Sequence, residues 1–228
     1  MNEMQVDEIV SAPVDDIELE GHLAVPAGAK GIVAFAHGSG SSRHSPRNQH
    51  VAEILRDGGL GTLLIDLLTD EEEEVDLQTA EYRFDIDMLA RRLVGIARWL
   101  KSEPRTEHLK VGYFGSSTGG GAALVSAAEI PELVDAVVSR GGRPDLAEGA
   151  LEEVEVPTLL IVGGKDEQVI QLNRQAFERL PGPKKLEIVP GASHLFEEPG
   201  KLDVVADLAR TWFRGNLGRP NRGDGGVH

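Results

Sequence analysis

The spacing of hydrophobic residues changes near residue 31 of the chain. Before that point, residues 17–25 place aliphatic side chains on one face by strict alternation, and Pro26 ends the run. This pattern is typical of a half-exposed strand, which we expect to pair antiparallel with a strand around residues 5–12. The chain therefore begins with a predicted hairpin that buries one face.

After residue 31, short and almost continuous apolar runs replace the alternation. Each run is long enough for a strand that is covered on both faces. Six runs are predicted strands: 31–36, 62–66, 110–114, 136–139, 158–162 and 185–189. Apolar residues that recur at helical spacing predict helices over 86–100 and 200–213.

Strands that alternate with helices indicate right-handed βαβ units. We therefore expect a mostly parallel sheet of about eight strands with helices on both faces and an antiparallel first pair. No internal repeat or linker divides the chain, so residues 1–214 are predicted to form one domain. The segment 215–228 is rich in glycine and poor in apolar residues, which predicts a mobile tail.

Residues 67–85 form one long insertion between a predicted strand and a predicted helix. The charge run at 69–76 favours a solvated loop, because a block of like charges stays hydrated. The alternative is a lid, since the segment follows a strand end, where ligands enter sheets of this kind. Both interpretations stay open from the sequence.

The composition limits the partners of this chain. Its 228 residues include 38 acidic and 23 basic side chains, which gives a formal charge of −15 and disfavours nucleic acid as a ligand. The absence of cysteine excludes disulfides, thiolate metal sites and a cysteine nucleophile. The histidines do not show metal-site spacing, so we predict no metal. An acidic start without a signal-peptide pattern, and apolar runs too short to span a bilayer, predict a cytoplasmic protein without a membrane partner.

A G-x-S-x-G motif follows the predicted strand 110–114, with Ser117 between Gly115 and Gly119. The Ala-rich sequence behind the motif predicts a helix, so Ser117 is expected in a sharp strand-to-helix turn with an exposed hydroxyl. The backbone amide of Thr118 would then point to an oxyanion site. A turn without chemistry has the same composition, and the motif by itself leaves that alternative open.

A serine nucleophile requires a base, and the base requires a carboxylate to orient it. Asp166 lies four residues beyond the predicted strand 158–162, and His194 follows the predicted strand 185–189. The chain order Ser117, Asp166, His194 is the order found in hydrolases that carry this serine turn. We therefore predict these three residues as a catalytic triad.

The loop after strand 31–36 reads His37-Gly-Ser39-Gly-Ser-Ser. In hydrolases with this serine turn, such a loop supplies the second amide of the oxyanion hole, and we predict the amide of Ser39. His37 is predicted to brace the loop by hydrogen bonding. Four arginines in other predicted loops are candidate substrate-binding residues, although ion pairs with the abundant local acids are favoured: Arg43, Arg83, Arg140 and Arg143.

With these segments in this order, the chain resembles the dienelactone hydrolase-like family of the α/β-hydrolases over residues 15–214. The resemblance rests on the His-Gly-Ser-Gly loop, the serine turn, Gly-Gly-Lys-Asp166 and Gly-Ala-Ser-His194. It implies an α/β-hydrolase fold with a minimal cap, and hydrolysis of esters or lactones through an acyl-enzyme without a cofactor. The namesake enzymes use a cysteine nucleophile, so Ser117 favours ordinary carboxylesterase action on a small-molecule ester.

Two other functions stay open from the sequence. The same triad could run a thioesterase or an acyltransferase, provided that an acyltransferase excluded water. A non-catalytic binding protein could also use this fold, because a fold does not fix a function.

Overall fold

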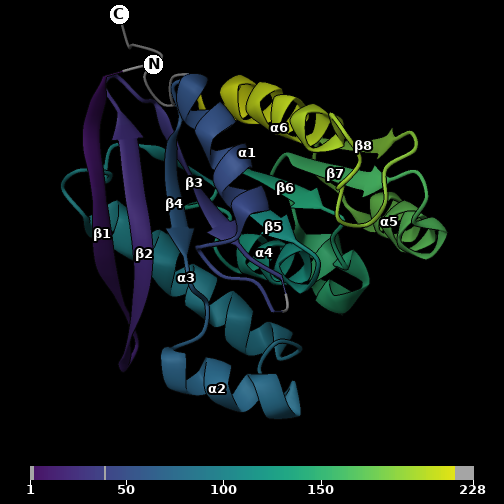
Figure 1. The fold of residues 1–228 in the computed structure, drawn as a ribbon, viewed down its shortest axis with the longest axis horizontal. Helices are drawn as coiled ribbons and strands as arrows, with labels where there is room; N and C mark the ends of the chain where they lie inside the picture. The colour runs from purple at the N-terminus through teal and green to yellow at the C-terminus, as the bar shows by residue number, and fades with distance from the viewer. Residues whose placement is uncertain (1–2, 39, 219–228) are drawn as a thin grey trace, which may run out of the picture.

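The computed structural model describes residues 3–38 and 40–218 as one α/β structure (Figure 1). Eight strands form one sheet in the order β1-β2-β4-β3-β5-β6-β7-β8. The elements, in chain order, are β1 (Met4–Val14), β2 (Ile17–Pro26), β3 (Gly31–Ala36), α1 (Pro46–Asp57), β4 (Gly61–Ile65), α2 (Asp70–Thr79), α3 (Ile86–Ser102), β5 (Lys110–Ser116), α4 (Thr118–Glu129), β6 (Ala136–Arg140), the 3-10 helix η1 (Pro144–Glu153), β7 (Thr158–Gly163), α5 (Glu167–Arg179), β8 (Lys184–Val189) and α6 (Lys201–Leu217).

The predicted hairpin is confirmed, and so is the change to a parallel sheet after it. β1 and β2 pair antiparallel, with Val14 opposite Ile17 at the turn. β2 then joins β4 in an antiparallel pairing, while β3 through β8 pair in parallel. The expectation of full burial holds for β3 to β7 but is wrong for β8, which forms the sheet edge and leaves much of its surface partly exposed.

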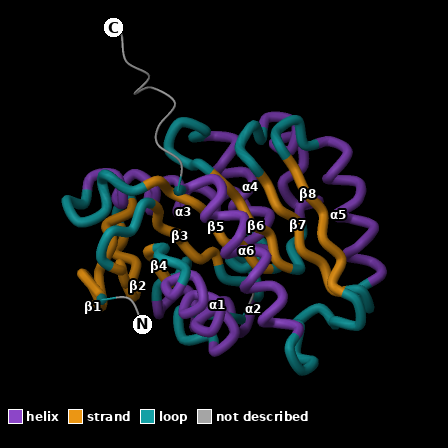
Figure 2. The backbone as a smooth tube through the Cα atoms, turned by 90° about the horizontal axis from the view of Figure 1, so that it is seen from above, coloured by secondary structure: helices purple, strands orange, loops and turns teal. Residues whose placement is uncertain are grey.

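Helices cover both faces of the sheet, as the alternation of strands and helices predicted. In Figure 1, α1 and α6 lie above the sheet and α3 and α4 lie below it. Figure 2 shows the strands β5 to β8 running side by side, with α6 packed over them and α1 nearer to β4. Side chains that alternate along β6 divide between the two layers: Val138 packs with the α1 and α6 side, and Val137 packs with the α3 and α4 side.

Two segments differ from the prediction. Residues 70–79 form the helix α2 and not a solvated loop, because Thr69 and Glu72 make a reciprocal capping box at its start and acidic residues fill its first turn. α6 continues to Leu217, which is fully buried, so the packed domain extends beyond residue 214. The rest of the predicted tail, 219–228, lies outside the described residues.

Candidate active site

Ser117 lies in the predicted sharp turn between β5 and α4. Its backbone has φ 51° and ψ −122°, a left-handed conformation that is strained for a residue with a side chain. The turn is tight because Gly119 approaches β3: a Cβ atom there would lie 2.2 Å from the carbonyl oxygen of Ala36. The turn places Ser117 beyond the carboxyl end of a central strand, at the amino end of α4.

Asp166 and His194 meet across the ends of two neighbouring strands. Asp166 Oδ2, at the end of the loop after β7, lies 2.6 Å from Nδ1 of His194, which lies within the loop after β8. Backbone hydrogen bonds hold these loops together, from Gly164 N–H to Val189 and from Lys165 N–H to Ala192. Because Nδ1 faces the carboxylate, Nε2 is the nitrogen left to exchange a proton with a nucleophile.

Glu198 also connects the loop after β7 with the loop after β8. Its carboxylate accepts the backbone N–H of Ser193 at 3.0 and 2.9 Å and contacts Lys165 Nζ at 3.1 Å. These partners precede His194 and Asp166 directly in the chain. The Ser193 N–H is the main cause that lowers the pKa of the Glu198 carboxyl to about 2, and Lys165 adds to it.

The segment after β6 lies between the nucleophile and the base. The backbone N–H of Ser117 donates to the carbonyl of Arg140 at 3.4 Å. The next residue, Gly141, packs on the imidazole: a Cβ atom there would lie 3.4 Å from His194 Cε1. Ser117, Asp166 and His194 therefore converge at one edge of the sheet from β5, β7 and β8.

The loop after β3 reaches the other side of Ser117. A Cβ atom on Gly38 would lie 2.9 Å from Ser117 Cβ, so this loop passes directly beside the nucleophile. Ser39, the predicted oxyanion donor, lies outside the described residues. His37 accepts the backbone N–H of Leu67 on Nε2 at 2.9 Å, which is the bracing contact predicted for it. Burial lowers the pKa of His37 and favours the neutral ring that this contact needs.

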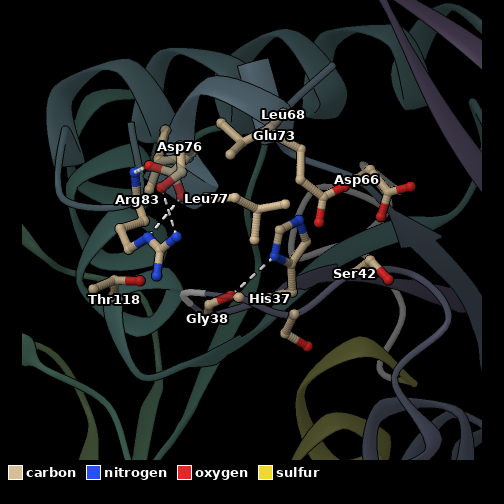
Figure 3. A pocket seen from close by; sticks show the side chains of 13 residues that line it. His37, Gly38, Ser42, Asp66, Leu68, Glu73, Asp76, Leu77, Arg83 and Thr118 are labelled. Atoms are coloured by element: carbon tan, nitrogen blue, oxygen red, sulfur yellow. Dashed lines mark hydrogen bonds and ion pairs between the residues drawn. The ribbon is translucent and has the colours of Figure 1, made fainter. Parts of the chain in front are cut away.

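A cavity of about 30 Å³ adjoins Thr118 and Gly38, with room for about two water molecules. Figure 3 shows His37 and Asp66 on one side of it, Arg83 and Thr118 on the other, and Leu77 between them. α2 supplies part of the lining, so residues 67–85 form a roof over this cavity. The roof is a single helix, in keeping with a minimal cap.

Sequence reasoning did not identify two ion pairs of the roof, of which one attaches it to α3 and the other lies within it. Arg92 on α3 contacts both carboxylate oxygens of Glu72, at 2.6 and 2.5 Å, and also donates to the carbonyl of Leu67. Asp76 is buried and contacts Arg83 Nε at 2.6 Å. Arg83 lowers the pKa of the Asp76 carboxyl by hydrogen bonding and charge, against the opposing effect of desolvation.

The four candidate arginines separate into two groups. Three of them pair with carboxylates: Arg43 with Asp66 and Glu20, Arg83 with Asp76, and Arg143 with Asp145. Arg140 is different, because its side chain is buried and no carboxylate of the described residues pairs with it. Burial and the nearby charge of Arg47 lower the pKa of Arg140 to about 10.

The sheet order and the serine turn after β5 define the class of this protein: it is an α/β-hydrolase. A family model described as "Dienelactone hydrolase family" matches residues 19–213, and the chain belongs to this family. The crystal structure of a dienelactone hydrolase from Anabaena variabilis is 62% identical with a TM-score of 0.93, covering 95% of this chain and 100% of that chain. The resemblance inferred from the motifs is therefore confirmed.

Two curated relatives add to this comparison. A Mycobacterium tuberculosis (strain H37Rv) protein named "Putative phosphoribosyl transferase" is 55% identical over 214 residues, which are 94% of this chain and 47% of that protein. The chain thus spans about half the length of this relative. A "Putative carboxymethylenebutenolidase" of Aquifex aeolicus is 23% identical over 208 residues, which are 86% of this chain and 90% of that protein.

Across residues 3–38 and 40–218, no group of three or more histidine and carboxylate side chains could hold a metal ion. Within the same part of the chain, the helices are too short or too polar to cross a membrane.

Proposed function

We propose that this chain hydrolyses small carboxylic esters or lactones through an acyl-enzyme on Ser117. The observation that carries the proposal is the strained backbone of Ser117 beside an Asp166–His194 pair at 2.6 Å. A strained serine at a strand-to-helix turn is costly, and such strain is concentrated at functional sites. A turn without chemistry would have no reason to converge with an oriented imidazole.

The proposed reaction starts when His194 Nε2 takes the Ser117 proton and the hydroxyl oxygen attacks the ester carbonyl. The Thr118 amide, at the positive end of α4, and the predicted Ser39 amide stabilise the oxyanion. His194 then protonates the leaving alcohol. Water attacks the acyl-enzyme in the same way and regenerates the serine, while Asp166 holds the imidazole and stabilises its positive charge.

Substitution of the nucleophile tests this proposal. Ser117→Ala should keep the fold and lower kcat for a p-nitrophenyl ester by about 10³-fold or more, because the acyl-enzyme cannot form. A fluorophosphonate probe should label the wild type once per chain and leave the Ser117→Ala variant unlabelled. Both measurements use the same preparations, with circular dichroism to check folding.

Ser116→Ala is the matched control. Ser116 is the buried last residue of β5, so its replacement should leave both the labelling and the turnover nearly intact. An inactive Ser116→Ala beside an active Ser117→Ala would mean that the nucleophile has been assigned to the wrong serine. Absence of labelling in the folded wild type would favour a non-catalytic binding protein.

A further inference from the structure

Arg140 carries a charge that the described structure leaves without a counterion. The residue is only 7% exposed, and its Nε is buried without a hydrogen-bond partner. Its guanidinium lies over the ring of Phe196, 5.9 Å from the centroid. That contact offsets only part of the cost of burying a charge, because buried ions are normally paired with an opposite charge.

A second cation lies close to the first. Arg47 stands in the first turn of α1, and its guanidinium contacts Glu197, the residue that follows Phe196 beneath Arg140. Its Nε is also buried without a partner, and its one carboxylate contact is loose, at 3.8 Å from the exposed Glu197. The first turn of α1 contains no acidic residue, so the positive end of this helix adds to the same field.

This arrangement is unusual for a chain with 38 acidic residues and a formal charge of −15. The other three candidate arginines pair with carboxylates, whereas Arg140 has no carboxylate partner among the described residues and Arg47 has only a loose one. Their position is also specific: Arg140 accepts the N–H of Ser117 on its carbonyl, and Phe196 follows His194 by two residues. The Arg140 backbone therefore contacts the nucleophile, and its guanidinium lies over the loop that carries His194, on the side of the sheet covered by α1 and α6.

We propose that Arg140 and Arg47 form an anion subsite for a phosphate group carried by the ester substrate. A carboxylate balances one guanidinium, whereas a phosphate monoester, with a charge near −2 at neutral pH, balances both. Its oxygens can accept hydrogen bonds from the unpartnered guanidinium nitrogens and lie near the amino end of α1. The inference rests on the proposed esterase function and adds the class of substrate.

Three matched p-nitrophenyl esters test the subsite. Their acyl chains have equal length and end in a methyl, a carboxylate or a phosphonate, which is a stable substitute for phosphate. The wild type should hydrolyse the phosphonate ester with the highest kcat/KM, about tenfold or more above the methyl ester. Arg140→Gln should lower kcat/KM for the phosphonate ester by about 10- to 100-fold. It should therefore also lower the ratio of kcat/KM for the phosphonate ester to kcat/KM for the methyl ester.

Arg47→Gln provides an independent variant, since this side chain is 37% exposed and its replacement is not expected to affect folding. Arg47→Gln should lower the ratio of kcat/KM for the phosphonate ester to kcat/KM for the methyl ester by about 3- to 10-fold. Arg143→Gln is the matched control from the loop after β6: its charge is already paired with Asp145, so the ratio should stay as in the wild type.

The subsite would be overturned if Arg140→Gln lowered kcat/KM equally for all three esters, or if the wild type preferred the carboxylate ester. It would also be overturned if Arg143→Gln lowered the phosphonate-to-methyl ratio of kcat/KM as much as Arg140→Gln does. A folded Arg47→Gln enzyme with an unchanged ratio would also overturn it. Hydrolysis of the methyl ester and labelling of Ser117 report on the esterase proposal separately. A wild type that turns over the methyl ester without preferring the phosphonate would refute the subsite and leave the esterase intact.

Discussion

The base side of the candidate site and the roof over its cavity are held together in different ways. Asp166 and His194 follow β7 and β8, which are neighbours in the sheet, and short backbone hydrogen bonds join their loops. The roof helix α2 is attached to α3 through side chains, where Arg92 contacts Glu72, and the pair of Arg83 with Asp76 lies within the roof. Leu77 on α2 is 69% exposed, whereas β7 under the base side is fully buried and β8 is partly buried.

This difference predicts that the base side determines proton transfer and the roof determines the entry and release of substrate. A site that moves protons must hold its donor and acceptor at a fixed distance, which a backbone framework provides. A roof must admit and release substrate, which a helix attached by a few side chains can do through local opening. We therefore expect changes on the base side to lower kcat and changes under the roof to raise KM.

The largest expected effect is on the base side. Asp166→Asn should lower kcat by about 10³-fold or more with a nearly unchanged KM, because an amide favours the wrong imidazole tautomer and does not stabilise the imidazolium. In a chymotrypsin-type triad the same replacement lowers kcat by about 10⁴-fold. The measurement is steady-state kinetics on one p-nitrophenyl ester, with circular dichroism to confirm folding.

Two neighbouring carboxylates are the controls for this variant. Glu167 begins α5, and Asp145 pairs with Arg143, so Glu167→Gln and Asp145→Asn should retain most of the activity. A folded Asp166→Asn enzyme with near-normal kcat beside a crippled control would show that another carboxylate orients His194.

A smaller effect is expected under the roof. Arg92→Ala removes the contacts to Glu72 and Leu67, which should lower the free energy of unfolding by about 2 kcal/mol and raise KM by about fivefold. The neighbouring Arg91 is exposed, so Arg91→Ala is the matched control. Thermal unfolding and limited proteolysis would report the loss of α2. A collapse of kcat at constant KM would contradict the division between the two regions.

The smallest expected effect comes from Glu198, which connects the two loops of the base side. Glu198→Gln weakens the contacts to Ser193 and Lys165 and should lower kcat by about threefold. Glu178→Gln, an exposed replacement on α5, should have no such effect. Equal kinetics in both variants would mean that Glu198 does not position the catalytic loops.

The same variant should also change the response to acid. Because the pKa of Glu198 is about 2 in the folded protein and 4.5 is its ordinary value, its stabilising contribution is fully present above about pH 4.5 and is lost as the pH falls towards 2. The difference in Tm between the wild type and Glu198→Gln should therefore shrink from pH 5 to about pH 2. A difference that stays constant across this range would contradict the assigned role of the carboxylate charge.

The sequence by itself determined the sheet, the serine turn and the loops that carry the predicted triad. These features depend on residues close together in the chain: an apolar run makes a strand, and a glycine two residues from Ser117 permits the tight turn. The structure of residues 67–85 was harder to predict from the sequence. The charge run favoured a solvated loop over the capping box of Thr69 and Glu72, and the partner of Glu72, Arg92, lies 20 residues away in the chain.

Only the tertiary structure decided the roles of the arginines. All four candidates were predicted in loops, and the sequence around them does not show which of them pairs with a carboxylate. Folding gave Arg83 a partner seven residues away, gave Arg43 one 23 residues away, and left Arg140 buried beside Arg47 without one. An ion pair depends on the distance between two side chains in space, and chain segments far apart in sequence set that distance. The sequence therefore shows which residues can be charged, and the fold determines which charges remain for a ligand.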